Sequence, residues 1–270
     1  MDLKLAGKTA LVTGSSKGIG EAIALALARE GASVIVHGRQ ASQARQVAER
    51  ITAAGGQACT ACGDIAGEDG VEAVLASAIA QAGPIDILVN NAGGSSAGTQ
   101  TWNDSHPEHW RATFQRNVLS TAQFSARVVP AMRARRWGRI LNIASVAALM
   151  PPAVNPDYAA AKAAVVAMTA SLSKAVAAEG ITVNAVSPGT IHSARLEARF
   201  RDIAAQAAGA PVDDWHEVQQ RVLPLMGGVP AGRVGTLDEL ADVATFLCSP
   251  LAAYVTGINL RVDGGMFVGI

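Results

Sequence analysis

The stretch that decides the fold is Thr13-Gly-Ser-Ser-Lys-Gly-Ile-Gly20, which joins a short apolar run at residues 9–12 to an amphipathic helical pattern. Gly14 permits a sharp turn, Gly18 lets the backbone approach a diphosphate, and Gly20 lets helix and strand pack closely. The free N–H groups at the start of the helix face such an anion. A glycine-rich turn before a helix is often only a turn, but its place after the first strand predicts a dinucleotide-binding unit.

The rest of the chain alternates strand and helix in the same way. Further apolar runs of strand type lie at residues 33–36, 59–62, 85–89, 140–143, 181–186 and 258–262, with helical patterns between them, the two longest at 107–133 and 157–179. Continuous apolar runs are typical of parallel strands that are buried on both faces. The alternation therefore predicts an α/β fold, with a parallel sheet covered by helices on both faces.

Composition places the chain among folded globular proteins. Of its 270 residues 50% are hydrophobic and 16% charged, and 22 Lys and Arg balance 22 Asp and Glu. A chain without net charge lacks the basic surface of nucleic-acid-binding proteins, so we expect no nucleic-acid partner. Charges in the first eight positions argue against a signal peptide, and polar breaks in each long apolar stretch argue against a membrane-spanning helix. We therefore expect a cytoplasmic protein without membrane association.

Cysteine and histidine indicate no metal or redox site. Three cysteines are too few for a disulfide framework. Cys59 and Cys62 form a C-x-x-C, but we predict both on one strand, where residues three apart point to opposite faces. No second Cys or His pair lies at ligand spacing, and His106-Pro-Glu-His109 is typical of a helix start. We expect no bound metal.

Polar or glycine-containing segments follow most of the predicted strands. They are the glycine loop, His37-Gly-Arg39, Asp64, Asn91-Ala-Gly93, Ser145 and Pro188-Gly189. The carboxyl ends of parallel strands meet at one edge of a sheet, and open α/β sheets bind their ligands in the crevice beyond that edge. These segments therefore predict a single site.

Five motifs together resemble those of the short-chain dehydrogenase/reductase family. They are Thr13-Gly14…Gly18-Ile-Gly20, Asn90-Asn-Ala-Gly93, Ser145, Tyr158-x-x-x-Lys162 and Pro188-Gly189, in this order over essentially the whole chain. The resemblance implies a single doubly wound, Rossmann-type domain over residues 1–270 with a seven-stranded parallel sheet. It also implies a bound nicotinamide dinucleotide, and a homodimer or homotetramer built on the helices at 107–133 and 157–179.

The predicted reacting centre contains Tyr158 and Lys162, which stand four apart on one helix and project from the same face. An ammonium beside a phenol favours the phenolate and lowers its pKa from about 10 toward the working range. Ser145, at the end of the preceding strand, is placed to hydrogen-bond the substrate oxygen. The resemblance adds Asn117, which would anchor a water in a proton relay; on sequence alone it could be a helix-surface amide. The predicted catalytic residues are Asn117, Ser145, Tyr158 and Lys162.

The charges near the second strand favour NADP over NAD as cofactor. The place where a carboxylate would bind the ribose 2′-OH falls at Gly38, and the cations Arg39 and Lys17 lie near it, although both could be solvated surface charges. Asp64 resembles the family residue that binds the adenine amino group, with a helix cap as the alternative. The predicted cofactor-binding residues are Gly14, Ser15, Ser16, Lys17, Gly18, Ile19, Gly20, Arg39, Asp64, Ile65, Asn91, Ala92, Gly93, Tyr158, Lys162, Pro188, Gly189, Ile191 and Ser193.

The predicted activity is hydride transfer that interconverts a small-molecule ketone and a secondary alcohol, with Tyr158 giving or taking the proton and no metal. The sequence leaves the substrate open. Residues 94–104 and 147–157 are expected to wall its pocket, and residues 192–233 to form a lid over it.

Two alternative functions are kept open. One is a 3-oxoacyl-[acyl-carrier-protein] reductase, because residues 132–139 resemble the basic region that such enzymes use to dock their acidic carrier. The other is a non-catalytic dinucleotide-binding regulatory protein. The intact set of Ser145, Tyr158 and Lys162 argues against this regulator, since a sensor has no need of all three.

Overall fold

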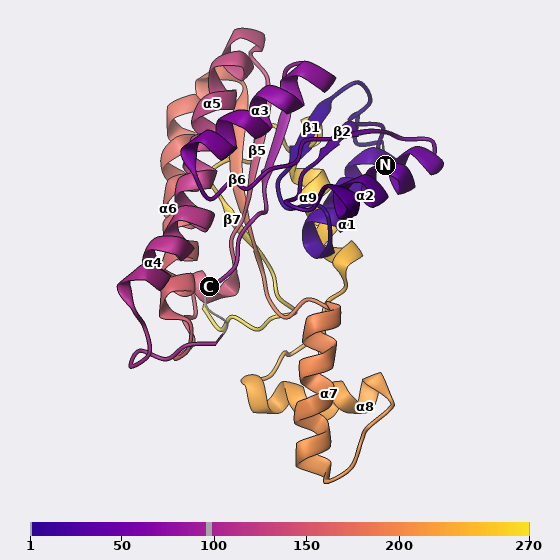
Figure 1. The fold of residues 1–270 in the computed structure, drawn as a ribbon, viewed down its shortest axis with the longest axis vertical. Coiled ribbons are helices and arrows are strands. Elements are labelled where there is room, and N and C mark those ends of the chain that lie inside the picture. Colours follow the sequence, from indigo (N-terminus) through magenta and orange to yellow (C-terminus); the bar gives the residue numbers. More distant parts are fainter. Residues whose placement is uncertain (1, 96–98, 270) are drawn as a thin grey trace.

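A computed structural model describes residues 2–95 and 99–269 of the chain. Within these residues seven parallel strands form one sheet, in the order β3-β2-β1-β4-β5-β6-β7 (Figure 1). The strands are β1 (Thr9–Val12), β2 (Ser33–Val36), β3 (Gln57–Thr60), β4 (Ile87–Asn90), β5 (Gly138–Ile143), β6 (Ile181–Pro188) and β7 (Asn259–Val262). The strand order reverses direction between β1 and β4, which makes their carboxyl ends the switch point where such folds bind ligands. The predicted α/β, doubly wound fold is confirmed.

Helices cover both faces of the sheet. They are α1 (Gly18–Arg29), α2 (Ala41–Ala53), α3 (Glu68–Ala82), α4 (Pro107–Phe114), α5 (Ser120–Arg135), α6 (Pro156–Val176), α7 (Ala194–Ala208), α8 (Trp215–Val222) and α9 (Leu237–Leu247). Helices α1, α2 and α9 lie on one face and α3, α5 and α6 on the other (Figure 1).

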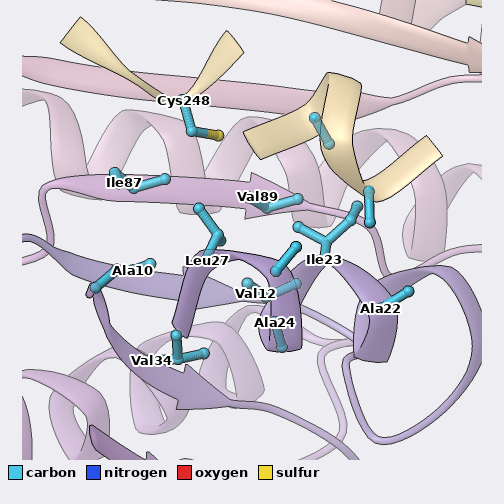
Figure 2. Packing of buried hydrophobic residues seen from close by; sticks show 14 of the residues in the cluster. Ala10, Val12, Ala22, Ile23, Ala24, Leu27, Val34, Ile87, Val89 and Cys248 are labelled. Carbon is cyan, nitrogen blue, oxygen red and sulfur yellow. The ribbon is translucent and has the colours of Figure 1, made fainter. Parts of the chain in front are cut away.

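Alternate strand residues enter the two cores, because successive side chains of a strand point to opposite faces. Val12 of β1 packs against α1 in one core, whereas Leu11 belongs to the core on the other face. Figure 2 shows Ile23 and Leu27 of α1 pointing toward Val89 of β4. Both faces of the central strands are thus buried, which explains their continuous apolar sequence.

Most elements begin or end within a few residues of the predicted positions, and two of the differences change an interpretation. Residues 107–133, predicted as one helix, are interrupted by a π-helical segment, Gln115–Leu119, between α4 and α5. Strand β3 ends at Thr60, because its partner β2 ends at Val36, so Cys62 lies beyond the strand and is exposed. The prediction that Cys59 and Cys62 both lie on this strand is therefore wrong.

One helical segment of the described residues, α6 with the turn after it (Pro156–Glu179), is long and apolar enough to cross a membrane. It packs along β6 and α4, and its side chains Asp157 and Lys162 are buried in protein. Of its apolar window 39% is buried, so one side of the helix faces the fold and the other does not.

Helices α7 and α8 form a separate cluster that projects beyond the sheet (Figure 1). Phe200 of α7 and Val218 of α8 are fully buried in a small core of their own. Ser193 caps α7 by accepting a hydrogen bond from Leu196 N, and Asp214 caps α8 in the same way from His216 N and Glu217 N. Two side-chain caps thus start the two helices of the predicted lid segment, residues 192–233.

Candidate active site

The glycine loop connects β1 to α1 and has the geometry that its glycines require. Gly14 and Gly18 have φ of +64° and +60°, a region that disfavours other residues. A Cβ at Gly14 would lie 3.0 Å from Ala92 Cα, and one at Gly20 would lie 2.5 Å from Gly14 O. Apart from its chain neighbours and the backbone of its own helix, no atom of the described residues lies within 4 Å of a Cβ placed on Gly18, so no other segment of them covers this glycine.

A groove of about 310 Å³ runs along this loop and the carboxyl ends of β2, β3 and β4. Eleven predicted cofactor-binding residues line it: Gly14, Ser16, Lys17, Ile19, Gly20, Arg39, Asp64, Ile65, Asn91, Ala92 and Gly93. His37, Gly38 and Arg116 line it as well and were not in the predicted set. Three cations therefore face one carboxylate, Asp64, and the end of β2 presents no acidic side chain. Such a groove fits a dinucleotide that carries an additional phosphate.

Three of the predicted cofactor-binding residues, Ser15, Asn91 and Asp64, use their side chains to hydrogen-bond the protein itself. Ser15 is fully buried; its Oγ donates to Val12 O at 2.7 Å and accepts from His37 N at 2.9 Å, so it braces the loop. Asn91 donates from Nδ2 to Thr13 O and Gly14 O at 2.9 and 3.0 Å. Asp64 accepts from Ala66 N at 3.1 Å in the turn before α3. The N-cap of α3 is Gly67, so Asp64 does not cap that helix and the capping alternative is wrong.

Thr13 and His37 are structural partners of the loop that the predicted residue set lacked. Thr13 Oγ1 accepts hydrogen bonds from Asn91 N and Ala92 N, both at 3.0 Å. His37 Nδ1 accepts from Gly14 N at 2.9 Å. The sequence signal for both is weak, because each is a single polar residue at the end of an apolar strand.

The end of β5 and the first turns of α6 bring the predicted reacting residues together. Ser145 follows β5, and its side chain lies near enough to Tyr158 of α6 to oppose the rise in the phenol pKa. Lys162 is buried, donates to Ile143 O at 2.7 Å, and has its Nζ 5.7 Å from the centroid of the Tyr158 ring. A Cβ at Gly93 would lie 3.2 Å from Lys162 Nζ, so the reacting residues adjoin the groove.

Burial governs the protonation of this cluster. It raises the pKa of Tyr158 above its ordinary value of 10, and the nearby Ser145 side chain opposes that rise. It lowers the pKa of Lys162 to about 8. The expected lowering of the Tyr158 pKa is not seen: burial raises it, and the smaller influence of Ser145 only partly offsets the rise. The Lys162 ammonium donates to the Ile143 carbonyl.

Asn117 lies in the π-helical segment and is buried. Its Nδ2 donates to Gly94 O at 2.9 Å and to Thr113 O at 2.8 Å, and its Oδ1 accepts from Gly94 N at 3.0 Å. A Cβ at Gly93 would lie 2.5 Å from this Oδ1. The side chain therefore fixes the segment after β4 beside Lys162, and the surface-amide alternative is wrong. Single π turns are frequent at functional sites.

Four predicted cofactor-binding residues lie at the end of β6 or just after it, and none of them lines the groove described above. Gly189 N donates to Val262 O at 2.9 Å, and Ile191 pairs with Gly235 as an isolated bridge. Ser193 Oγ is used to cap α7. Pro188 ends β6 in pairing with Val262. Of the predicted pocket wall, residues 96–98 lie outside the described part of the chain.

Comparison with known proteins gives matches along the whole chain. The sequence model for short chain dehydrogenase matches residues 8–204. The 3-oxoacyl-[acyl-carrier-protein] reductase FabG of Vibrio cholerae is 38% identical over 267 residues, covering 98% of this chain and 100% of the relative. FabG of Escherichia coli is 38% identical over 97% of this chain and 98% of its own length.

Two solved structures are also similar. L-Sorbose reductase from Gluconobacter frateurii, complexed with NADPH and L-sorbose, superimposes with a TM-score of 0.92 at 34% identity and covers 100% of both chains. A 7α-hydroxysteroid dehydrogenase, complexed with NADH and 7-oxo glycochenodeoxycholic acid, gives 0.85 at 35% identity over 98% of this chain and 96% of that one. Sequence and structure thus lead to one assignment: the chain belongs to the short-chain dehydrogenase family.

Proposed function

We propose that this oxidoreductase interconverts a ketone and a secondary alcohol with NADP(H), using Ser145, Tyr158 and Lys162 as its reacting residues. The observation that carries the proposal is their convergence at the carboxyl end of β5, beside Gly93 and the groove along the glycine loop. The groove would hold the dinucleotide, which when bound supplies or accepts the hydride.

Each reacting residue has a role that its contacts support. Tyr158 is protonated at neutral pH, since its pKa is raised, and it can give a proton to a carbonyl oxygen. Ser145, which lies beside Tyr158, would hold the same oxygen and stabilise its developing charge. Lys162 would bind the ribose hydroxyls through its ammonium. Asn117 would keep the segment after β4 in place and take part in the proton relay.

The preference for NADP(H) is supported by the charges of the groove. Lys17 and Arg39 line it near the end of β2, where Gly38 stands in place of a carboxylate. Arg binds phosphate through a fork of donors, and a carboxylate at this place would repel a 2′-phosphate. The NADPH bound by the sorbose reductase agrees with this preference.

A second candidate activity is that of a 3-oxoacyl-[acyl-carrier-protein] reductase. It is favoured by the FabG relatives, which match almost the whole chain at 38% identity. Residues 132–139 give it little structural support, because their arginines contact the protein itself: Arg133 contacts Glu179, Arg135 contacts Ile85 O and Asp86, Arg136 contacts Ala178 O, and Arg139 contacts Ser249 O and Gly180 O. The choice between candidates therefore depends on substrate measurements.

The test is a substrate panel with the purified protein and both reduced cofactors. Acetoacetyl thioesters of acyl carrier protein and of coenzyme A represent the second candidate, and ketoses, steroid ketones and simple ketones represent the first. Oxidation of the cofactor is followed by absorbance. Turnover of carrier-bound substrate far above the free ketones would favour the second candidate. Cofactor binding without turnover of any substrate would favour a regulatory protein.

Three further features belong to the same proposal. Residues 192–233 would form a substrate lid, supported by the separate core of α7 and α8.

A homodimer or homotetramer would use the outer helices, where Leu119 is 47% exposed near Ala112 and Ala122. A cytoplasmic location is supported by the three cysteines, all of which are free. Sedimentation of a monomer at micromolar concentration would contradict the assembly.

A further inference from the structure

His37 connects three loops at the carboxyl edge of the sheet. Its Nδ1 accepts a hydrogen bond from Gly14 N at 2.9 Å, and its Nε2 lies 3.2 Å from Gly63 O. Its backbone N donates to Ser15 Oγ at 2.9 Å, and its backbone O accepts from Ser15 N at 2.8 Å. The side chain is buried beneath the glycine loop and still borders the groove.

These partners fix the chemical form of the imidazole. Gly14 N can only donate and Gly63 O can only accept, so the ring must be neutral, with its hydrogen on Nε2. A protonated ring would carry a hydrogen on Nδ1 as well, directed at the N–H of Gly14. The hydrogen bond would be lost and the two donors would repel each other. Gly14, at φ +64°, would have to move.

The surroundings of His37 oppose its protonation. Burial, the largest influence, lowers its pKa below the ordinary 6.5, whereas the Gly63 carbonyl and the charge of Asp64 raise it. Lys17 from the glycine loop, Arg39 from the end of β2 and Arg116 from the π-helical segment are the cations that share the groove. The neutral form therefore predominates at neutral pH, and the ring charges only under acidic conditions.

We propose that His37 is a positioning residue for the cofactor, whose neutral imidazole holds the glycine loop in its binding conformation, so that protonation of this one side chain weakens dinucleotide binding. This inference rests on the proposed function, because it assigns the groove to NADP(H). The affinity falls on acidification because the cofactor's diphosphate needs the loop N–H groups aimed at it. Lys17, Arg39 and Arg116 already attract the anionic cofactor. We therefore expect the positive charge on His37 to add less to the cofactor affinity than displacement of the glycine loop removes.

The test compares NADP⁺ dissociation constants by calorimetry from about pH 5 to pH 8, the range in which histidine titrates. His37→Asn is the informative variant, since Asn Oδ1 stands as many bonds from Cα as Nδ1 and does not titrate. We expect wild type and His37→Asn to agree within about threefold at the alkaline end. At the acid end the wild type should bind about three- to tenfold more weakly than His37→Asn, the worth of one hydrogen bond.

Two controls make the comparison specific. His216→Asn changes an exposed histidine at the start of α8 and should keep the wild-type pH profile. Titration of the cofactor's own 2′-phosphate is common to all variants and cancels in the comparison. Parallel pH profiles for the wild type and His37→Asn would overturn the inference. A wild type that binds NADP⁺ at no pH would contradict the proposed function instead.

A second measurement follows the imidazole itself. Ring-carbon NMR shifts of the wild-type histidines report protonation directly, and the His37 signal is identified as the one missing from the spectrum of His37→Asn. Linkage is reciprocal, so if protonation weakens NADP⁺ binding, NADP⁺ must lower the pKa of His37. An unchanged or raised pKa on saturation with NADP⁺ would overturn the inference.

Discussion

Thr113 of α4 donates its hydroxyl to Asp157 Oδ2 of α6 at 2.5 Å, between two side chains that are fully buried. Asp157 immediately precedes Tyr158, and the carbonyl of Thr113 accepts from Asn117 Nδ2 at 2.8 Å. One buried hydrogen bond thus couples the helix that carries Tyr158 to the turn that carries Asn117. Within the described residues, the second oxygen of Asp157 has no hydrogen-bond partner.

Thr113→Val should destabilise the protein and slow turnover. The substitution keeps the shape of the side chain and leaves the buried Asp157 carboxylate without its donor, which costs about 1–3 kcal/mol. The free energy of unfolding by urea and kcat on an active substrate are measured together. Thr113→Ser retains the hydroxyl and is the matched control, so equal losses in both variants would show that the hydrogen bond is unimportant.

Lys162→Met should stabilise the folded protein at neutral pH while abolishing turnover. Burial lowers the Lys162 pKa from 10.5 to about 8, a difference worth about 3 kcal/mol against folding when the side chain is charged. The variant also loses the hydrogen bond to Ile143 O, which offsets part of the stabilisation. We therefore expect the free energy of unfolding to rise by about 1–3 kcal/mol.

The pH dependence of that gain has a definite sign. Between about pH 8 and pH 10.5 the unfolded chain binds more protons at this lysine than the folded chain, so wild-type stability rises with pH. Lys162→Met lacks this contribution, and its advantage should shrink across the same interval. Urea unfolding of both proteins at several pH values measures it. If the stability difference between Lys162→Met and the wild type stayed constant up to pH 10, the folded protein would not hold Lys162 as a buried charge.

Tyr158→Phe should remove turnover and leave cofactor affinity nearly intact. The hydroxyl is the proposed proton donor, whereas the cofactor groove is lined by the glycine loop and the segment after β4. General acid catalysis is worth about 10²–10⁴ in rate. Cofactor affinity is measured by fluorescence titration beside the kinetic assay. If Tyr158→Phe kept more than about a tenth of the wild-type kcat, Tyr158 would not be the general acid.

Arg39→Ala should weaken NADPH selectively and leave NADH nearly unchanged. A charge-assisted hydrogen bond is worth about 1.5–3 kcal/mol, hence roughly ten- to a hundredfold in kcat/KM for NADPH. Arg45→Ala, on an exposed arginine of α2, is the control. Equal losses with both cofactors would show that Arg39 does not contact the 2′-phosphate.

A full reversal of the cofactor preference needs two substitutions besides Arg39→Ala, namely Gly38→Asp and Ser16→Gly. A Cβ at Gly38 would lie 2.8 Å from both Cβ and Oγ of Ser16, so Gly38→Asp alone would displace the glycine loop. Ser16→Gly removes the obstruction. We expect Ser16→Gly, Gly38→Asp and Arg39→Ala together to favour NADH, judged by the ratio of kcat/KM values, with Ser16→Gly alone as the reference protein.

The sequence by itself determined the sheet, the glycine loop and the Ser145–Tyr158–Lys162 grouping. Each follows from local rules: continuous apolar runs give buried parallel strands, and spacing of four on a helix puts two side chains on one face. Because parallel strands end at a common edge, residues distant in the chain could be assigned to one site before any coordinates were known.

Only the tertiary structure decided which polar groups meet. His37 reaches Gly14 from a neighbouring strand, Thr113 reaches Asp157 from another helix, and burial raises the Tyr158 pKa despite the opposing influence of Ser145. The pairing of β3 with β2 ends at Thr60, so Cys62 lies beyond the strand. Asn117 lies in a π-helical segment and is buried. Hydrogen bonds require donor and acceptor within about 3 Å, and the periodicity of a sequence carries no information at that resolution about residues tens of positions apart.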